Sequence, residues 1–264
     1  MKPPGYSATS DRAGFTMIEI ALSLAIIGFA LVAIIGVMPT GMRVQKENRE
    51  ETVINQDGLF LLDAIRSGAK GLDDLTNFVE SITIRSGVSA DGLGGATTVF
   101  TNSVGPASNR ITNSMEIVGL LSRPKLEVMT DRTLRQNQVT LRMRAINGVA
   151  SDKSKRNDEL AFRYLVTVEI VPFSKGPSLV GLGTLADRAV ATELLNNLYD
   201  VRLTFRWPLF PKNQGWETGR GRKTFRTLVS GELTRVPALR PGEALYYFDP
   251  TGFTSLTNRL ATKL

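Results

Sequence analysis

Apolar and polar residues are distributed unevenly along this chain, with one long apolar run near the start and alternating stretches in the second half. The apolar run, FTMIEIALSLAIIGFALVAIIGVM, occupies residues 15–38 and contains a single charged residue, Glu19. As a helix, this run would rise about 36 Å, which exceeds the roughly 30 Å of a bilayer's hydrocarbon core. The pattern therefore predicts a membrane-spanning helix.

The helical pattern continues beyond the apolar run. Pro39 lacks a backbone donor and should kink or break the helix, after which the helix is expected to resume. Residues 42–68 contain no further proline, and five apolar residues recur there at helical spacing: Val53, Ile54, Leu61, Ala64 and Ile65. Such a stripe predicts a face that packs in a coiled coil or on a core. Gly58 is expected to be a tolerated weak point, and Ser67-Gly68 or Gly71 the stop.

After residue 110 the pattern changes to alternation, which is typical of half-buried strands. Three stretches show it most clearly, at residues 139–145, 162–170 and 201–207. Residues 223–233 and 116–121 are two further candidate strands. Because one face of the alternating strands is polar, we expect an antiparallel sheet.

The segments between these strands predict loops and short helices. Residues 72–84 predict a short helix followed by a brief strand, and residues 185–198 predict an inserted helix. Residues 86–110 are rich in Gly, Ser, Thr and Asn and predict an extended loop, and residues 151–158 and 208–220 predict two more. One long helix followed by a run of strands predicts an α+β fold.

Cysteine and histidine are both absent from the 264 residues. Their absence excludes cysteine and histidine nucleophiles, the Ser-His-Asp triad, zinc sites built from these residues, and disulfides. The chain also lacks a G-x-S-x-G motif, and its glycine-rich stretches at 92–95 and 215–224 miss the spacing of phosphate-binding loops. A membrane-anchored hydrolase would have to use carboxylates, but the adjacent acids at 73–74 and 158–159 are typical of a solvated surface. We therefore expect no enzymatic activity, no cofactor and no metal site.

The net charge is +7, and the excess is concentrated toward the C-terminus. Residues 199–264 carry 11 basic and 5 acidic residues, whereas residues 15–198 carry 19 of each. One segment of this basic end interleaves cations with aromatic residues: Trp216, Arg220, Arg222, Lys223, Phe225 and Arg226. This mixture suits contact with a nucleic-acid backbone and stacking on bases, so DNA is a candidate partner. The alternative is a solvated basic face.

Three interpretations of the apolar run compete: a cleaved secretory signal, a plain membrane anchor, and a helix that passes from the membrane into a protein assembly. A secretory signal should have a shorter apolar core followed by a small-residue cleavage site, whereas here residues 39–41 lead directly into a charged stretch. A carboxylate at the centre of a membrane helix costs about 2.5–3.5 kcal/mol. Glu19 therefore indicates a partner, unless it lies shallow enough to reach the headgroups.

The hexapeptide from Gly14 to Glu19, GFTMIE, resembles the GFTLIE-type prepilin signature of type IV pilins and type II secretion pseudopilins. Met17 and Ile18 are conservative departures, and the resemblance covers residues 1 to about 66. In that family a membrane-embedded prepilin peptidase cuts after the glycine and methylates the new amine, which here implies Gly14 and Phe15. The resemblance also implies that Glu19 pairs with the N-terminal amine of a neighbouring subunit, a partner that we expect the monomer to lack.

The resemblance implies a pilin-like organisation of the whole chain. Residues 1–14 would be the leader, residues 15–68 the N-terminal helix with its membrane part at 15–38, and residues 69–264 an α+β head with the helix packed on its antiparallel sheet. The size of the head favours a minor or specialised subunit of a pilus or pseudopilus.

The same resemblance implies a location and a set of partners. Lys2 and Arg12 precede the helix and favour a cytoplasmic leader, which leaves the head in the periplasm of a bacterial inner membrane and later toward the cell surface. The implied partners are prepilin peptidase, other pilin or pseudopilin subunits, the inner-membrane assembly platform and the membrane itself. The alternatives are a DNA-binding or adhesive minor pilin that uses the basic segment, and a membrane-anchored extracytoplasmic protein that does not assemble.

Overall fold

The computed structural model describes residues 14–68, 75–87, 95–102, 109–128, 134–146, 162–173, 193–213, 215–237 and 244–252. The chain divides into two compact units, with the boundary between Glu51 and Thr52. A single helix, α1 (Met17–Ser67), is 51 residues long and crosses this boundary in sequence.

The first unit contains the apolar part of α1, whose side chains are exposed from Met17 to Arg49. This part is long and apolar enough to cross a membrane. Pro39 lies inside α1, and the helix continues past it. The sequence predicted either a kink or a break at Pro39, and the helix does not break there.

The second unit begins with the last turns of α1, which pack on the head. All five residues of the predicted stripe, from Val53 to Ile65, are buried in one hydrophobic cluster with the sheet, so the core-facing interpretation is confirmed. The helix ends at Ser67, and Gly68 follows with a φ of +66°, as the sequence predicted. A positive φ favours glycine and stops helices in this way.

The helix α1 continues through Gly58, so this glycine is tolerated, as expected. A Cβ atom added at Gly58 would lie 2.6 Å from the ring of Phe225, which belongs to the sheet. The absence of a side chain at Gly58 therefore leaves room for the Phe225 ring where the helix packs closely on the sheet.

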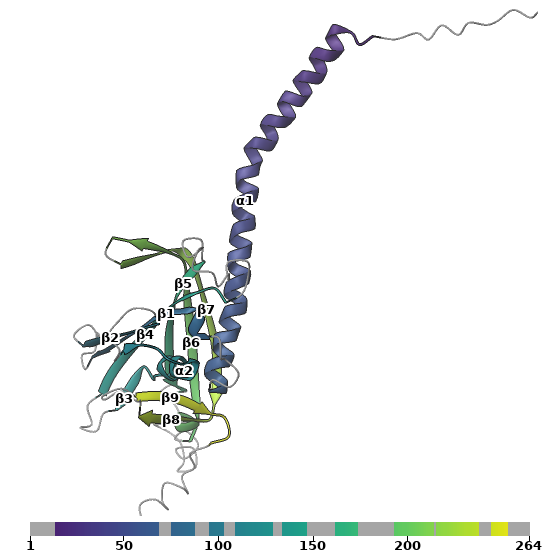
Figure 1. Cartoon of the computed structure of the whole chain (residues 1–264). Helices are drawn as coiled ribbons and strands as arrows, with labels where there is room; N and C mark the ends of the chain where they lie inside the picture. Colours follow the sequence, from purple (N-terminus) through teal and green to yellow (C-terminus); the bar gives the residue numbers. More distant parts are fainter. Residues whose placement is uncertain are drawn as a thin grey trace, which may run out of the picture. The chain divides into compact units, whose positions relative to one another are not determined.

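The head is built around a seven-stranded antiparallel sheet (Figure 1). Its strands are β1 (Val79–Gly87), β2 (Ala96–Thr101), β3 (Leu126–Val128), β4 (Leu134–Arg144), β5 (Arg163–Pro172), β6 (Leu198–Lys212) and β7 (Gly215–Ser230). They lie in the order β2-β1-β4-β5-β6-β7, and β3 pairs with β4. A separate two-stranded sheet contains β8 (Glu232–Pro237) and β9 (Ala244–Asp249), and the described part of the head also contains the short helices η1 (Leu75–Asn77) and α2 (Ser114–Leu121). These elements establish the predicted α+β class.

Three alternating stretches of the sequence lie in β4, β5 and β6, so those strand predictions are confirmed. Residues 72–84 contain η1 followed by the start of β1, which also agrees with the prediction for the described part. The candidate strand at 223–233 spans the end of β7 and the start of β8. Residues 151–158 and 185–192 lie outside the described residues, and residues 193–197 are helical.

Three local predictions are wrong. Residues 116–121 are helical rather than extended, because Asn113 caps the helix α2 by accepting a hydrogen bond from the backbone N–H of Glu116 at 2.7 Å. Residues 86–110 contain the strand β2 rather than loop alone. Residues 208–220 are also mostly strand, because the β6–β7 ladder continues past a bulge to the pair Lys212 and Gly215.

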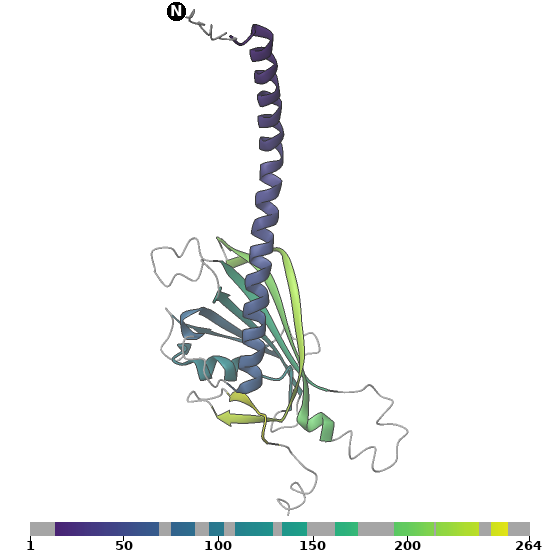
Figure 2. The same cartoon turned by 90° about the vertical axis from the view of Figure 1, so that its right-hand side faces the viewer.

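The two faces of the large sheet differ in character. One face carries the core and receives α1, whose last turns lie along it (Figure 2). On the opposite face, here called the outer face, five threonines occupy one continuous row through successive strand pairs: Thr83, Thr140, Thr167, Thr204 and Thr224. This row is flanked by charged residues, which include Arg206 and Arg222 on one side and Arg202 and Arg226 on the other.

Candidate functional site

The N-terminal site contains Gly14, Phe15 and Glu19. Gly14 and Phe15 precede α1 and are exposed, with 81% of Phe15 accessible and nothing within 4 Å of a Cβ added at Gly14. The Gly14–Phe15 peptide bond therefore lies outside the helical hydrogen-bond ladder. A bond in this position is accessible to a peptidase without unwinding of the helix.

Glu19 forms local hydrogen bonds within the monomer, while its expected pairing with a neighbouring subunit's amine stays a prediction. Its Oε2 atom accepts hydrogen bonds from the backbone N–H of Thr16 at 3.5 Å and from the Thr16 hydroxyl at 3.4 Å. Thr16 directly precedes the first residue of α1, so the Glu19 side chain reaches back to the Thr16 backbone N–H, which is one half of a Thr-x-x-Glu capping box. Both residues are exposed, which leaves the carboxylate accessible to a second partner.

The basic segment lies on β7, and its alternation divides the candidate nucleic-acid contacts between two faces. Arg220, Arg222 and Arg226 are exposed and share the outer-face phase of the strand, while Lys223 is half-buried in the phase of Phe225. Phe225 packs edge-on against Phe205 with ring centroids 5.3 Å apart. Lys223 therefore does not share a surface with the three arginines.

Arg226 is engaged within the protein. Its Nε donates to Oδ1 of Asp200 at 2.7 Å, and Nε of Arg202 donates to Oδ2 of the same carboxylate at 2.9 Å. Burial acts to raise the pKa of Asp200, but the hydrogen bonds and charges of the two arginines outweigh it and hold this pKa below its usual value. The Asp200 carboxylate therefore offsets part of the positive charge of Arg202 and Arg226, and it links β6 to β7.

Trp216 lies against two arginines that the sequence pattern did not single out. The guanidinium of Arg142 is 4.6 Å from the centroid of the indole ring, and that of Arg163 is 5.7 Å away. Both guanidiniums also pair with Glu80, through Arg142 Nε at 3.0 Å and Arg163 Nε at 2.6 Å. The start of β7 is therefore held on the outer face by cation–π contacts with β4 and β5.

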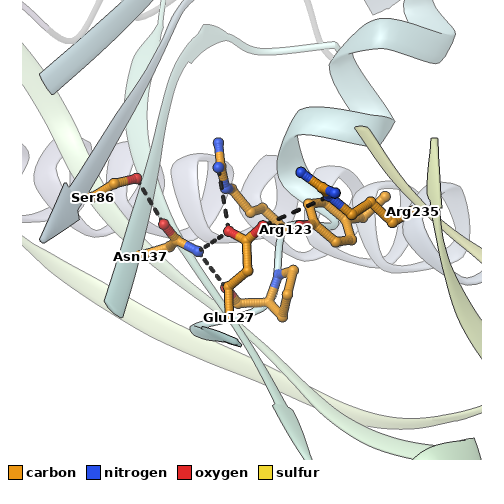
Figure 3. Close-up of polar contacts among 7 residues, drawn as sticks. Ser86, Arg123, Glu127, Asn137 and Arg235 are labelled. Atoms are coloured by element: carbon orange, nitrogen blue, oxygen red, sulfur yellow. Dashed lines mark hydrogen bonds and ion pairs between the residues drawn. The ribbon is translucent and has the colours of Figure 1, made fainter. Parts of the chain in front are cut away.

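A buried polar network surrounds Glu127 on the short strand β3 (Figure 3). The Glu127 carboxylate accepts hydrogen bonds from Arg123 Nη2 at 3.3 Å, from Asn137 Nδ2 at 3.2 Å and from the hydroxyl of Tyr246. Arg235 Nε lies 3.8 Å from its Oε1. The network connects β3 and β4 of the large sheet with β8 and β9.

The same contacts set the pKa values of this network. Burial acts to raise the pKa of Glu127, but the hydrogen bond from Tyr246 and the charge and hydrogen bond of Arg123 outweigh it and keep this pKa below its usual value. Burial and the hydrogen bond to Glu127 raise the pKa of Tyr246 to about 12. A carboxylate held ionised by three donors is suited to structural support rather than to proton transfer.

A second buried carboxylate joins α1 to the sheet, and sequence reasoning missed it. Asp57 is fully buried on α1, and its Oδ2 accepts hydrogen bonds from the Tyr164 hydroxyl at 2.7 Å and the Ile146 backbone N–H at 3.1 Å. In the sequence, the only sign of this contact was a single aspartate within the apolar stripe of the helix. Because a buried polar group needs a defined partner, this contact fixes where the helix sits on the head.

Among the residues that the structure describes, no group of three or more acidic side chains comes together to hold a metal ion. Comparisons with protein-family models, with curated proteins and with solved structures find no match for this chain.

Proposed function

We propose that this chain is a pilin-like structural subunit of a type IV pilus or pseudopilus, of a minor or specialised kind. The observation that carries the proposal is the GFTMIE sequence at the entrance to α1, where the Gly14–Phe15 bond precedes the helix and Glu19 lies in its first turn. In this proposal prepilin peptidase cuts after Gly14 and methylates the amine of Phe15.

The exposed apolar surface of α1 supports an assembly role. Large apolar side chains lie on all sides of its first part, among them Met17, Ile18, Leu22, Phe29, Val32 and Val37. A helix that is apolar all round needs either lipid or other apolar helices around it. The inner membrane would cover this surface first, and the helices of other subunits would cover it after the assembly platform extracts the chain.

Glu19 supplies the polar contact that such an assembly needs. Cleavage after Gly14 creates an amine at Phe15, and in a bundle of apolar helices the amine of one subunit would pair with Glu19 of the next. A buried pair of opposite charges is tolerated where a single buried charge is not, so the pair would fix the stagger between subunits. The capping contact with Thr16 holds the carboxylate at the helix start until that partner arrives.

The competing function is a membrane-anchored extracytoplasmic protein that is neither cleaved nor assembled. The test is the N-terminal mass of the protein in the membrane fraction of cells that contain a prepilin peptidase. We expect a chain that begins with a methylated Phe15, and we expect Gly14→Leu to retain the leader because a bulky residue blocks the cut. A wild-type protein of the full 264 residues would support the plain anchor instead.

A further inference from the structure

The outer face of the large sheet carries more positive than negative charge, and its acids are already paired. Glu80 pairs with Arg142 and Arg163, and Asp200 pairs with Arg202 and Arg226. The third acid of this face, Glu169, accepts from Lys125 at 2.8 Å. Any further arginine on this face would therefore need an anionic partner from outside the described head.

Arg206 and Arg222 are such arginines. They lie directly opposite each other in the register of β6 and β7, and both are exposed. Within the described part of the chain, neither forms an ion pair. Like charges in directly opposed positions destabilise a sheet, and their Cβ atoms are about 4.5–5.5 Å apart. Two guanidinium groups at this spacing can both donate to one tetrahedral oxyanion.

An aromatic side chain lies further along the same row of the sheet. Arg206 pairs with Leu165, and Leu165 pairs with Arg142, so these residues and Arg222 form one row across four strands. The indole of Trp216 lies over Arg142 and remains 39% exposed. At a strand spacing of about 4.8 Å, Arg142 is about 10 Å from Arg206 along the row. The row thus places an exposed indole and an arginine pair on one surface.

Hydroxyl groups border the arginine pair. Thr204 lies two residues before Arg206 and Thr224 two residues after Arg222 on the same face, and the Oγ1 atoms of the two threonines are 3.2 Å apart. A pair of phosphate-binding cations, neighbouring hydroxyl donors and an aromatic platform together characterise sites for single-stranded nucleic acid. A sulfated polysaccharide would use the cations but would have no base to place on the indole.

We propose that this row binds a single strand of nucleic acid, with Arg206 and Arg222 on a backbone phosphate and Trp216 stacked on a base. The surface differs from the segment suggested by the sequence, because it adds Arg206 and does not use Arg220, Lys223 or Arg226. It does not depend on cleavage or assembly of the chain.

The test is the salt dependence of binding by the full chain in a nonionic detergent, measured by fluorescence anisotropy with a labelled mixed-sequence DNA strand of about 20 nucleotides. Each phosphate contact to a single strand contributes about 0.7 to the slope of log K against log salt. Because both arginines contact the same phosphate, the double variant Arg206→Gln/Arg222→Gln should lower the magnitude of this slope by about 0.7. The control Arg43→Gln/Arg49→Gln removes the same charge from α1 and should leave the slope unchanged.

Two further arms identify the ligand class and guard against misfolding. Trp216→Leu should weaken DNA binding by about tenfold without a change in slope, because stacking is insensitive to salt counterions. The double glutamine variant should unfold no earlier than the wild type, since it relieves a like-charge contact. Equal slopes for the two double variants, an unchanged affinity for Trp216→Leu, or tight binding of heparin in place of DNA would overturn the proposal.

Discussion

Replacing Tyr164 by phenylalanine tests how α1 is held on the head. This change removes one oxygen atom from the core and leaves the apolar ring, which contacts Phe162 and Phe205. The lost hydroxyl donates at 2.7 Å to the fully buried carboxylate of Asp57. Without it, Asp57 loses one of its hydrogen-bond donors in a site that water does not reach.

The expected cost follows from the charge of the acceptor. Hydrogen bonds to charged groups contribute about 1.5–3 kcal/mol to the free energy of unfolding, compared with about 0.5–1.5 kcal/mol for neutral pairs. Tyr199→Phe is the matched control, because the Tyr199 hydroxyl donates to a neutral carbonyl, that of Asn196, at 3.2 Å. In an Asp57→Asn background, Tyr164→Phe should cost less than in the wild type, and the difference measures the coupling.

The pair also predicts a difference at alkaline pH. Burial raises the pKa of Tyr164 well above its ordinary value, and the nearby charge and hydrogen bond of Asp57 raise it further. Above pH of about 10 the unfolded chain releases the Tyr164 proton while the folded chain keeps it, so stability falls as the pH rises. This group contributes a fall of about 1.4 kcal/mol per pH unit, which Tyr164→Phe should remove.

The assay is unfolding of the full chain by guanidinium in detergent, followed by tryptophan fluorescence at pH 7 and above pH 10. A Tyr164→Phe midpoint no lower than that of Tyr199→Phe, together with an unchanged alkaline slope, would refute the contact between Tyr164 and Asp57. A lower midpoint at pH 7 combined with a shallower alkaline slope would support it.

Two further changes probe other parts of the head. Gly58→Ala should lower the free energy of unfolding by about 1–2 kcal/mol, because the new Cβ atom would press on the Phe225 ring. Gly41→Ala is the control and should not lower this free energy, because the space around Gly41 is open. The guanidinium midpoints of the two variants test this difference. Glu127→Gln should cost about 3 kcal/mol at pH 7 by leaving buried Arg123 without its carboxylate partner. Because the pKa of Glu127 is lowered on folding, the ionised carboxylate stabilises the folded chain above pH of about 4.3, and this stabilisation is lost as the pH falls. Between pH 5 and pH 3, the urea midpoint of Glu127→Gln should therefore decline less than that of the wild type.

Elements with an uninterrupted pattern could be predicted from the sequence. The stripe from Val53 to Ile65 repeats at helical spacing and is buried as expected, and the alternation at 201–207 matches the burial along β6. Such patterns record which side of an element faces the core. They are therefore informative whenever an element is long and has one polar face.

Elements that depend on a cap or on a neighbouring strand could not be predicted in the same way. The apolar residues 116–121 fit a buried strand as well as a helix, and only the Asn113-x-x-Glu116 cap indicates the helix. Residues 208–220 contain Pro and Gly that suggest a loop, but pairing started between Arg206 and Arg222 extends through them. A ladder of this kind is set by the partner strand, which the local sequence does not contain.

The same limit applies to the candidate sites. The segment from Trp216 to Arg226 stands out because its cations are close in sequence, whereas Arg206 becomes its neighbour only through strand pairing. Likewise, Asp57 and Tyr164 are far apart in the chain and meet only when α1 packs on β5. The GFTMIE motif from Gly14 to Glu19 could be recognised in the sequence because all of its residues are consecutive.

The most direct test of the proposed assembly is incorporation of Glu19→Val into filaments, measured as the ratio of sheared surface protein to membrane-bound protein beside the wild-type machinery. Removing the carboxylate would leave a neighbour's buried amine unpaired at a cost of about 3–5 kcal/mol. Thr16→Val is the matched control, because it removes the contact between the Thr16 hydroxyl and Glu19 and keeps the carboxylate. We expect Glu19→Val to insert in the membrane and be cleaved but to be absent from the sheared fraction, while Thr16→Val is incorporated. Normal incorporation of Glu19→Val would contradict the assembly role and leave Glu19 as a helix cap on a plain membrane anchor.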